Sequence, residues 1–197
     1  MKIYDISQEV FGCAVYPGDP SPKKETLASM GDGDLYNLTA FSMCAHNGTH
    51  IDAPSHFIEN GDSVEKIPLS KFIGHAYVAE CSGVVDANCV KEIVRKAKDA
   101  LKGSEKRILV KGKAELSLEG ASALITEGVY LYGNESQTVG PENAPMAVHK
   151  LLLGEKTVLL EGIRLSDVPE GVYLLFSAPL LLKGTEGSPC RAVLVEL

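Results

Sequence analysis

The sequence predicts an α/β protein in which strands and helices form a layered core, and three observations support this fold class. Short apolar runs typical of strands alternate with segments of helical period. Each helical segment starts at a residue that favours a helix N-terminus and is followed by a glycine. A length of 197 residues suits one domain with a sizeable core. We therefore expect a single α/β domain over residues 1–197.

The helices and strands are predicted from caps, apolar spacing and turn residues. The three helices cover residues 86–101, with Asp86 as cap and Gly103 able to close it, residues 117–127, with Ser117 as cap, and residues 145–153, starting at Pro145 and ending before Gly154. The strands cover residues 2–6, 35–44, 76–81, 107–110, 129–132, 157–161, 172–177 and 192–196, and a turn-rich loop covers 17–22.

The composition excludes several classes of protein. The charged fraction of 23% and the apolar fraction of 45% are those of a soluble globular domain. A net charge of −7 argues against nucleic acid and anionic membranes as partners, since both require clustered Lys and Arg. No apolar stretch has the length of a signal peptide or a membrane span. The five cysteines are odd in number and predict neither a disulfide framework nor a cysteine zinc site. We expect a cytoplasmic protein.

The residues that carry chemistry are concentrated between positions 46 and 56, where three of the five histidines lie. His46, His50 and Asp52 supply two imidazoles and a carboxylate at the spacing of a first-row metal site. Asn47-Gly48 and Pro54 disfavour a helix, so a turn should lead into a short extended piece. His50 and Asp52 would then point to the same side. Burying such a cluster without a metal would have a large desolvation cost, so we predict a metal site.

Two later residues, His149 and Glu161, could reach the same pocket from a helix and from the end of a strand. Each one alone is a weak signal. His149 could be an ordinary histidine on an apolar helix face, and Glu161 could be an ordinary surface carboxylate.

Several motifs together resemble one family. The run His46-x-Gly48-Thr49-His50-x-Asp52-x-Pro54-x-His56 resembles the signature of the cyclase family of metal-dependent hydrolases, whose best-known members are bacterial kynurenine formamidases. Tyr16-Pro17-Gly18-Asp19 and the segment 186–192 resemble the family's early turn and closing segment, and His149 and Glu161 fall at its later ligand positions. The resemblance implies a compact swivelling β/β/α domain with a mixed sheet, and a homodimer.

The resemblance also implies a mechanism. Five ligands (His46, His50, Asp52, His149 and Glu161), of which the two carboxylates can bridge, suit one or two Zn²⁺ or Mn²⁺ ions better than a closed structural zinc. An open metal position activates water and polarises an amide carbonyl. His56 is the predicted proton shuttle. Tyr16 is predicted to contact the substrate, and Phe41 and Phe57 are further candidates for contact with an aromatic ring.

The sequence departs from the formamidase pattern in ways that leave the substrate open. Tyr16 stands where formamidases have tryptophan, segment 133–140 differs from the family's, and the stretch after strand 107–110 is short. An aryl formamide such as N-formylkynurenine is the leading substrate. A cyclic amide or lactone, as in isatin hydrolases, is one alternative. A metal-dependent ligand-binding protein without turnover is another, although the presence of His56 favours an enzyme.

Overall fold

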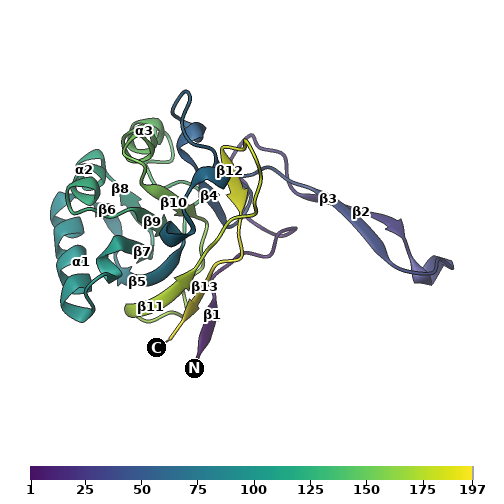
Figure 1. Ribbon diagram of the computed structural model, residues 1–197, viewed down its shortest axis with the longest axis horizontal. Helices are drawn as coiled ribbons and strands as arrows, with labels where there is room; N and C mark the ends of the chain where they lie inside the picture. The colour runs from purple at the N-terminus through teal and green to yellow at the C-terminus, as the bar shows by residue number, and fades with distance from the viewer. Residues whose placement is uncertain (197) are drawn as a thin grey trace.

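The computed structural model describes residues 1–196, and their main element is a nine-stranded mixed sheet that curls around a core (Figure 1). Strands β5, β7, β9 and β10 run parallel to one another, and the other neighbours in this sheet are antiparallel. The spatial order is β1 (Ile3–Asp5), β13 (Val193–Val195), β11 (Gly171–Phe176), β5 (Ile73–Glu80), β7 (Arg107–Lys111), β9 (Leu131–Asn134), β10 (Val158–Glu161), β4 (His50–Asp52) and β12 (Gly187–Pro189).

Within the described residues, three α-helices pack on one face of this sheet: α1 (Ala87–Ala100), α2 (Leu118–Thr126) and α3 (Met146–Gly154). Both predicted caps are confirmed. The Asp86 side chain accepts hydrogen bonds from the backbone N–H groups of Asn88 and Cys89, and Ser117 accepts one from Gly120. Gly154 is the last residue of α3, so this helix ends slightly later than predicted. None of these helices is long and apolar enough to span a membrane.

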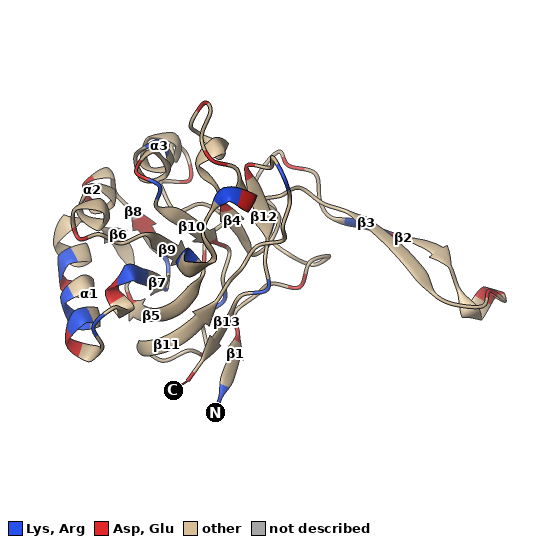
Figure 2. Ribbon diagram, viewed as in Figure 1, with Lys and Arg blue, Asp and Glu red and all other residues tan. Residues whose placement is uncertain are grey.

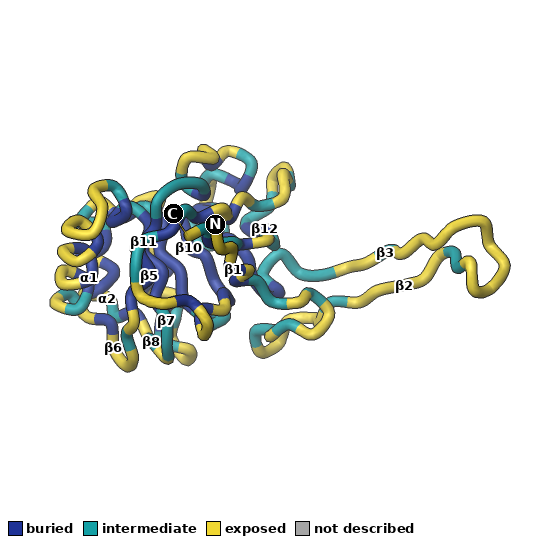
Figure 3. Tube along the Cα trace, turned by 90° about the horizontal axis from the view of Figure 1, so that it is seen from below, coloured by how far each residue is buried: buried dark blue, intermediate teal, exposed yellow. Residues whose placement is uncertain are grey.

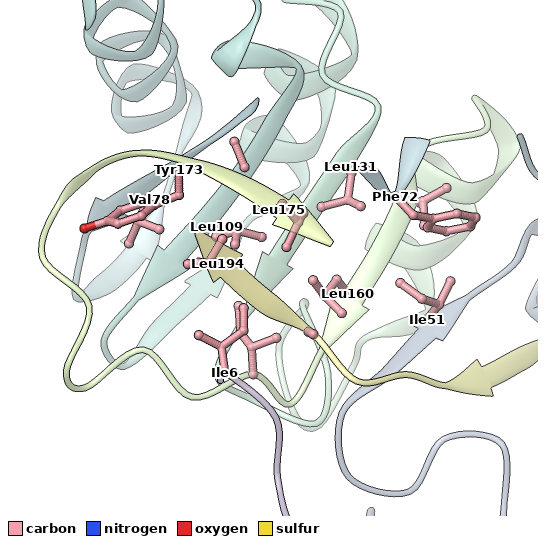
Figure 4. Close-up of a cluster of buried hydrophobic side chains, with 14 of the residues drawn as sticks. Ile6, Ile51, Phe72, Val78, Leu109, Leu131, Leu160, Tyr173, Leu175 and Leu194 are labelled. Atoms are coloured by element: carbon pink, nitrogen blue, oxygen red, sulfur yellow. The ribbon is translucent and has the colours of Figure 1, made fainter. Parts of the chain in front are cut away.

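Alternation along the strands divides the buried apolar side chains into two clusters. Ile51, Leu109 and Leu160 belong to the cluster that the curled sheet encloses (Figure 4). Ile108 and Leu159, their neighbours along the chain, belong to the cluster beneath the helices. Successive side chains of a strand point to opposite faces, so the position of each strand residue decides which face it reaches. The α/β fold class with a mixed sheet is thereby confirmed.

Each of the eight predicted strands overlaps an observed one, but the strand predicted at 35–44 lies outside the main sheet. Its observed counterpart β3 (Leu38–Ser42) pairs with β2 (Lys23–Ala28), which was not predicted because Lys23-Lys24-Glu25-Thr26 is polar. The two strands project from the body as a hairpin that we call the arm, residues 23–42 (Figures 1 and 3).

The remaining elements are short and were also not predicted. Strands β6 (Gly83–Val85) and β8 (Ala114–Leu116) form a small parallel sheet. Turns of 3₁₀ helix occur at Met30–Asp32, Pro54–His56, Val64–Lys66, Leu69–Lys71 and Ser104–Lys106.

Candidate metal centre

The floor of the candidate site is formed where β4 lies between β10 and β12. In this register His50 is directly opposite Glu161, and Asp52 is opposite Gly187. Ile51 points into the enclosed core, so His50 and Asp52 both point to the helix-covered face. The predicted common orientation of His50 and Asp52 thus follows from the period of the strand. Glu161 reaches the same face because residues directly opposite in an antiparallel pair share a side.

Helix α3 brings His149 to this face from the layer above. Its Nε2 lies 3.1 Å from Oε1 of Glu161 and 3.6 Å from Oδ2 of Asp52. Nε2 of His50 lies 3.4 Å from Oδ1 of Asp52 and 3.4 Å from Oε2 of Glu161. All four side chains are at most 4% exposed. The structure therefore gathers two imidazoles and two carboxylates in a buried cluster.

Backbone carbonyls determine which nitrogen of each inner histidine faces the carboxylates. Nδ1 of His50 donates to the carbonyl oxygen of Gly48 at 3.0 Å, and Nδ1 of His149 donates to that of Pro145 at 2.9 Å. In the neutral rings, the lone pair of each Nε2 then faces carboxylate oxygens, which are also acceptors. Such an arrangement of acceptors requires a cation between them, either a proton or a metal ion, and a carbonyl on the far nitrogen is typical of metal-binding histidines.

The pKa values show the same preference for positive charge. Burial lowers the pKa of His50, but Asp52 and Glu161 outweigh it and raise that pKa to about 10. Burial also lowers the pKa of His149, which Glu161 and Asp52 raise overall. Burial raises the pKa of Asp52, but hydrogen bonds and charge from His46 and His50 bring it well below its usual range.

His46 joins Asp52 from a turn that precedes β4. Its Nδ1 lies 2.8 Å from Oδ1 of Asp52, and its ring occupies space over Gly187, where a Cβ atom would lie 2.5 Å from its Cε1. Within residues 1–196, Nε2 of His46 and Oδ2 of Asp52 are buried without a hydrogen-bond partner. Two sets of ligand atoms each lie within 4.8 Å of one another: His46, His50 and Asp52, and Asp52, His149 and Glu161. Both sets fit a divalent cation, and they share Asp52.

His56 lies at the side of this centre, in the 3₁₀ turn Pro54–His56. Its ring stacks on that of His46 with centroids 4.1 Å apart and an angle of 26°. The ring of Phe57 packs edge-on against that of His56, with centroids 4.4 Å apart. The centroids of the Phe57 and His149 rings are 4.9 Å apart. Burial lowers the pKa of His56. Its imidazole is therefore close to the candidate ligands but makes no direct contact with a carboxylate among the described residues.

A cavity of about 300 Å³ opens onto these groups. Tyr16, Asp19 and Phe57 line it together with the histidines. Phe41 instead lies on the arm and is 61% exposed. A larger hollow of about 1070 Å³ is lined by residues of β6 and β8 and of the segment 135–143 and, among the described residues, by no histidine. We place the site in the smaller cavity because the ligand groups converge there.

Sequence reasoning missed a polar network behind the histidines. Nε2 of Gln137 donates to the Gly48 carbonyl at 2.9 Å, the same oxygen that accepts from His50. Nε2 of Gln8 donates to Oε1 of Gln137 at 2.8 Å and to the carbonyl of Gly162 at 2.8 Å. Gly162 has a φ of +69°, and a Cβ atom there would lie 2.3 Å from the Gly48 carbonyl oxygen. No local signal could have revealed this network, because its members are far apart in sequence.

The comparisons with known proteins agree with this geometry. The chain matches the family model described as "Putative cyclase" over residues 4–140. It is 32% identical to the kynurenine formamidase of Erythrobacter litoralis (strain HTCC2594), with 100% of this chain and 94% of the relative covered. The chain belongs to the cyclase family. The predicted family resemblance is confirmed, and the chain is a metal-dependent hydrolase of this family.

Solved structures of the cyclase family share the fold. A structure described as a potential metal-dependent hydrolase with cyclase activity is 26% identical, with a TM-score of 0.82 and coverage of 98% of this chain and 96% of the other. Isatin hydrolase A from Labrenzia aggregata bound to benzyl benzoate is 22% identical, with a TM-score of 0.81 and coverage of 98% and 93%. The second likeness concerns the fold alone.

Proposed function

We propose that this cyclase-family protein hydrolyses the C–N bond of a small amide that is not a peptide, with an aryl formamide such as N-formylkynurenine as the leading substrate. The observation that carries the proposal is the pair His50 and His149, whose Nδ1 atoms are held by carbonyls while their Nε2 atoms face Asp52 and Glu161 beside a cavity of about 300 Å³. The E. litoralis relative, a kynurenine formamidase, supports the choice of bond.

The two sets that share Asp52 are the proposed ligands of one or two divalent ions. Imidazole ligands suit Zn²⁺, and carboxylate ligands also suit Mn²⁺, so these are the two metals that we propose. When bound, a divalent metal lowers the pKa of water and polarises a carbonyl oxygen. The buried carboxylates of Asp52 and Glu161 would offset its charge.

The residues of the chain have distinct roles in the proposed hydrolysis. His56 accepts a proton as water adds to the amide carbon, and it returns that proton to the nitrogen as the C–N bond breaks. The products are an amine and a carboxylic acid, which loses its proton to water and becomes a carboxylate. The stack on His46 and the edge of Phe57 hold the His56 ring beside the cavity.

The walls of the cavity support an aromatic substrate. Tyr16 and Phe57 supply apolar ring surface, and the volume is at the small end of the range for ligand pockets. A cyclic amide or lactone would meet the same walls, and the fold shared with an isatin hydrolase favours this second candidate. His56 would transfer the proton in the hydrolysis of either kind of substrate.

Metal content and turnover test the proposal together. Protein purified without chelator should contain at least one equivalent of Zn²⁺ or Mn²⁺ and should hydrolyse N-formylkynurenine, formanilide or isatin after metal addition. His56→Ala, purified in parallel, controls for contaminating hydrolases. Metal binding without turnover of any amide or lactone would favour a ligand-binding protein. Absence of metal binding would overturn the proposal.

We also propose the setting in which the enzyme works. Residues 1–197 would form one domain, in keeping with the single large sheet and with alignment to relatives along the whole chain. A homodimer in the cytoplasm, without nucleic acid or membrane as partner, is consistent with the family resemblance and with a net charge of −7.

A further inference from the structure

The ring of His46 is oriented in the opposite way from those of the other two candidate histidine ligands. In His50 and in His149, Nδ1 donates to a backbone carbonyl and Nε2 faces the carboxylates. In His46, Nδ1 is the nitrogen that lies 2.8 Å from Oδ1 of Asp52. A neutral imidazole has one N–H and one lone pair, so a ring that offers Nδ1 to a metal ion carries its proton on Nε2.

The Nε2 edge of the His46 ring faces the start of β12. A Cβ atom on Gly187 would lie 2.5 Å from Cε1 of His46 and 2.9 Å from its Nε2. Glu186 directly precedes β12, the strand at one edge of the main sheet (Figure 2). Oε1 of Glu186 lies 3.5 Å from Nε2 of His46. Two separate observations therefore place this nitrogen beside residues 186 and 187.

Nε2 of His46 needs an acceptor, and Glu186 is in position to supply one. This nitrogen is buried and has no hydrogen-bond partner within residues 1–196. A buried N–H without an acceptor is costly. Oε1 of Glu186 is a few tenths of an ångström beyond the usual N–H···O range of roughly 2.7–3.2 Å. The backbone of Glu186 is fixed, because its carbonyl accepts from the N–H of Ala53 at 2.9 Å, but its side chain is 47% exposed and can move closer.

An acceptor on the outer nitrogen is what the two inner histidines already have. A ligating histidine usually donates its other N–H to a carbonyl or a carboxylate, which fixes the ring and makes the metal-facing nitrogen more basic. The carbonyls of Gly48 and Pro145 do this for the inner rings. A charged acceptor makes a shorter and stronger hydrogen bond than a neutral one. The carboxylate of Glu186 can therefore hold a ring that lies on a turn.

We propose that Glu186 is a positioning residue of the metal centre, whose carboxylate accepts the Nε2–H of His46 and thereby directs the Nδ1 lone pair to the cation that His46 shares with Asp52. Glu186 itself touches neither the cation nor the substrate. The inference rests on the proposed function, because it requires a metal in the ligand set that contains His46. It extends that function by a residue outside both ligand sets.

Zinc affinity tests this role without any substrate. Competition for Zn²⁺ between stripped full-length protein and a chromophoric chelator should give a dissociation constant raised about 10- to 100-fold in Glu186→Ala, the usual contribution of an outer partner. Glu186→Gln loses the charge but keeps an acceptor oxygen, so its affinity should lie much closer to that of the wild type. Glu119→Ala, at an exposed glutamate of α2, is the control and should bind as the wild type does.

Two results of this titration would overturn the role of Glu186. Unchanged affinity in Glu186→Ala would show that His46 does not depend on the carboxylate. Equal losses in Glu186→Ala and Glu186→Gln would assign the effect to charge alone and not to the orientation of the ring.

The position of the proton on His46 provides a direct test. Long-range ¹⁵N–¹H spectra of the zinc-bound protein distinguish the protonated nitrogen of each ring from the metal-bound one, and the chain has five histidines to assign. We expect the proton on Nε2 of His46 but on Nδ1 of His50 and His149. A proton on Nδ1 of His46 would overturn the inference and leave the proposed function intact. Failure of the wild type to bind zinc would overturn both, whereas the expected spectra without turnover would support the inference and overturn the proposed hydrolysis alone.

Discussion

The inner and outer halves of the metal centre are built on different kinds of structure. His50, Asp52 and Glu161 lie on paired strands, His149 lies on a helix, and their side chains are at most 4% exposed. His46 is on a turn with its side chain 16% exposed, and Tyr16 is on a loop at the cavity. Regular elements hold side chains more rigidly than loops do. We therefore propose that the inner half holds the cation, that His46 adds one more ligand from the outer half, and that the other outer residues, His56 and Tyr16, handle the proton and the substrate.

Replacing Asp52 should abolish metal binding by the inner half, and we expect this substitution to have the largest effect on metal content and activity. Asp52→Asn keeps the size of the side chain but removes the charge shared by both ligand sets. Metal content should fall to near zero, and kcat/KM should drop by about 10³-fold or more, because metal catalysis contributes several kcal/mol. Elemental analysis and kinetics on the same sample check this. Asp62→Asn, at a surface ion pair with Lys156, is the control and should change neither quantity.

Replacing His56 should reduce turnover without removing the metal, and so should separate the function of the outer half from that of the inner half. His56→Ala should retain its metal and lose about 10²- to 10⁴-fold in kcat, the usual contribution of a proton shuttle. His75→Ala, at a half-buried histidine of β5 outside the cavity, serves as the control. Loss of metal from His56→Ala would assign His56 to the ligands instead.

Two substitutions within the inner half should have graded effects. Glu161→Gln removes a negative charge that lies beside both His50 and His149, whereas His149→Ala removes one neutral ligand of the set to which both residues belong. Both should lower metal stoichiometry in part, and Glu161→Gln should raise the metal concentration needed for activity more. Titration of metal into stripped protein measures both effects. If stoichiometry and metal dependence are unchanged in both variants, the centre holds one ion and these residues are structural.

Substitutions in the polar network behind His50 should have a smaller effect on metal affinity and activity. Gln137→Met keeps the bulk of the side chain but removes the donor to the Gly48 carbonyl, so His50 loses part of its orientation. Outer partners of metal ligands usually contribute about 10- to 100-fold in metal affinity or activity. Added metal should restore the variant if affinity is what changed. Gln8→Met, one hydrogen bond further away, should have a weaker effect of the same kind.

What could be predicted from the sequence depended on whether the residues concerned lie close together along the chain. The His46–His56 run is local, and strand period alone placed His50 and Asp52 on one side. Caps at Asp86 and Ser117 defined two helices because capping depends on adjacent residues. The Gln8–Gln137 contact joins residues 129 positions apart, so no local pattern contains it. The arm escaped prediction because β2 is polar and pairs only with β3.

Substitutions at Tyr16, in the outer half, should have the smallest effect on activity, and this effect should be limited to aromatic substrates. Its ring lines the cavity, and its hydroxyl donates only a long bond of 3.4 Å to the carbonyl of Glu142. Tyr16→Phe should therefore be nearly neutral. Tyr16→Ala should raise KM for aryl amides about 2- to 10-fold with little change in kcat, because an aromatic contact is worth about 0.5–1.5 kcal/mol. A small aliphatic formamide has no ring to lose contact, so its KM should not change, and an equal rise for both substrates would place Tyr16 outside the substrate contact.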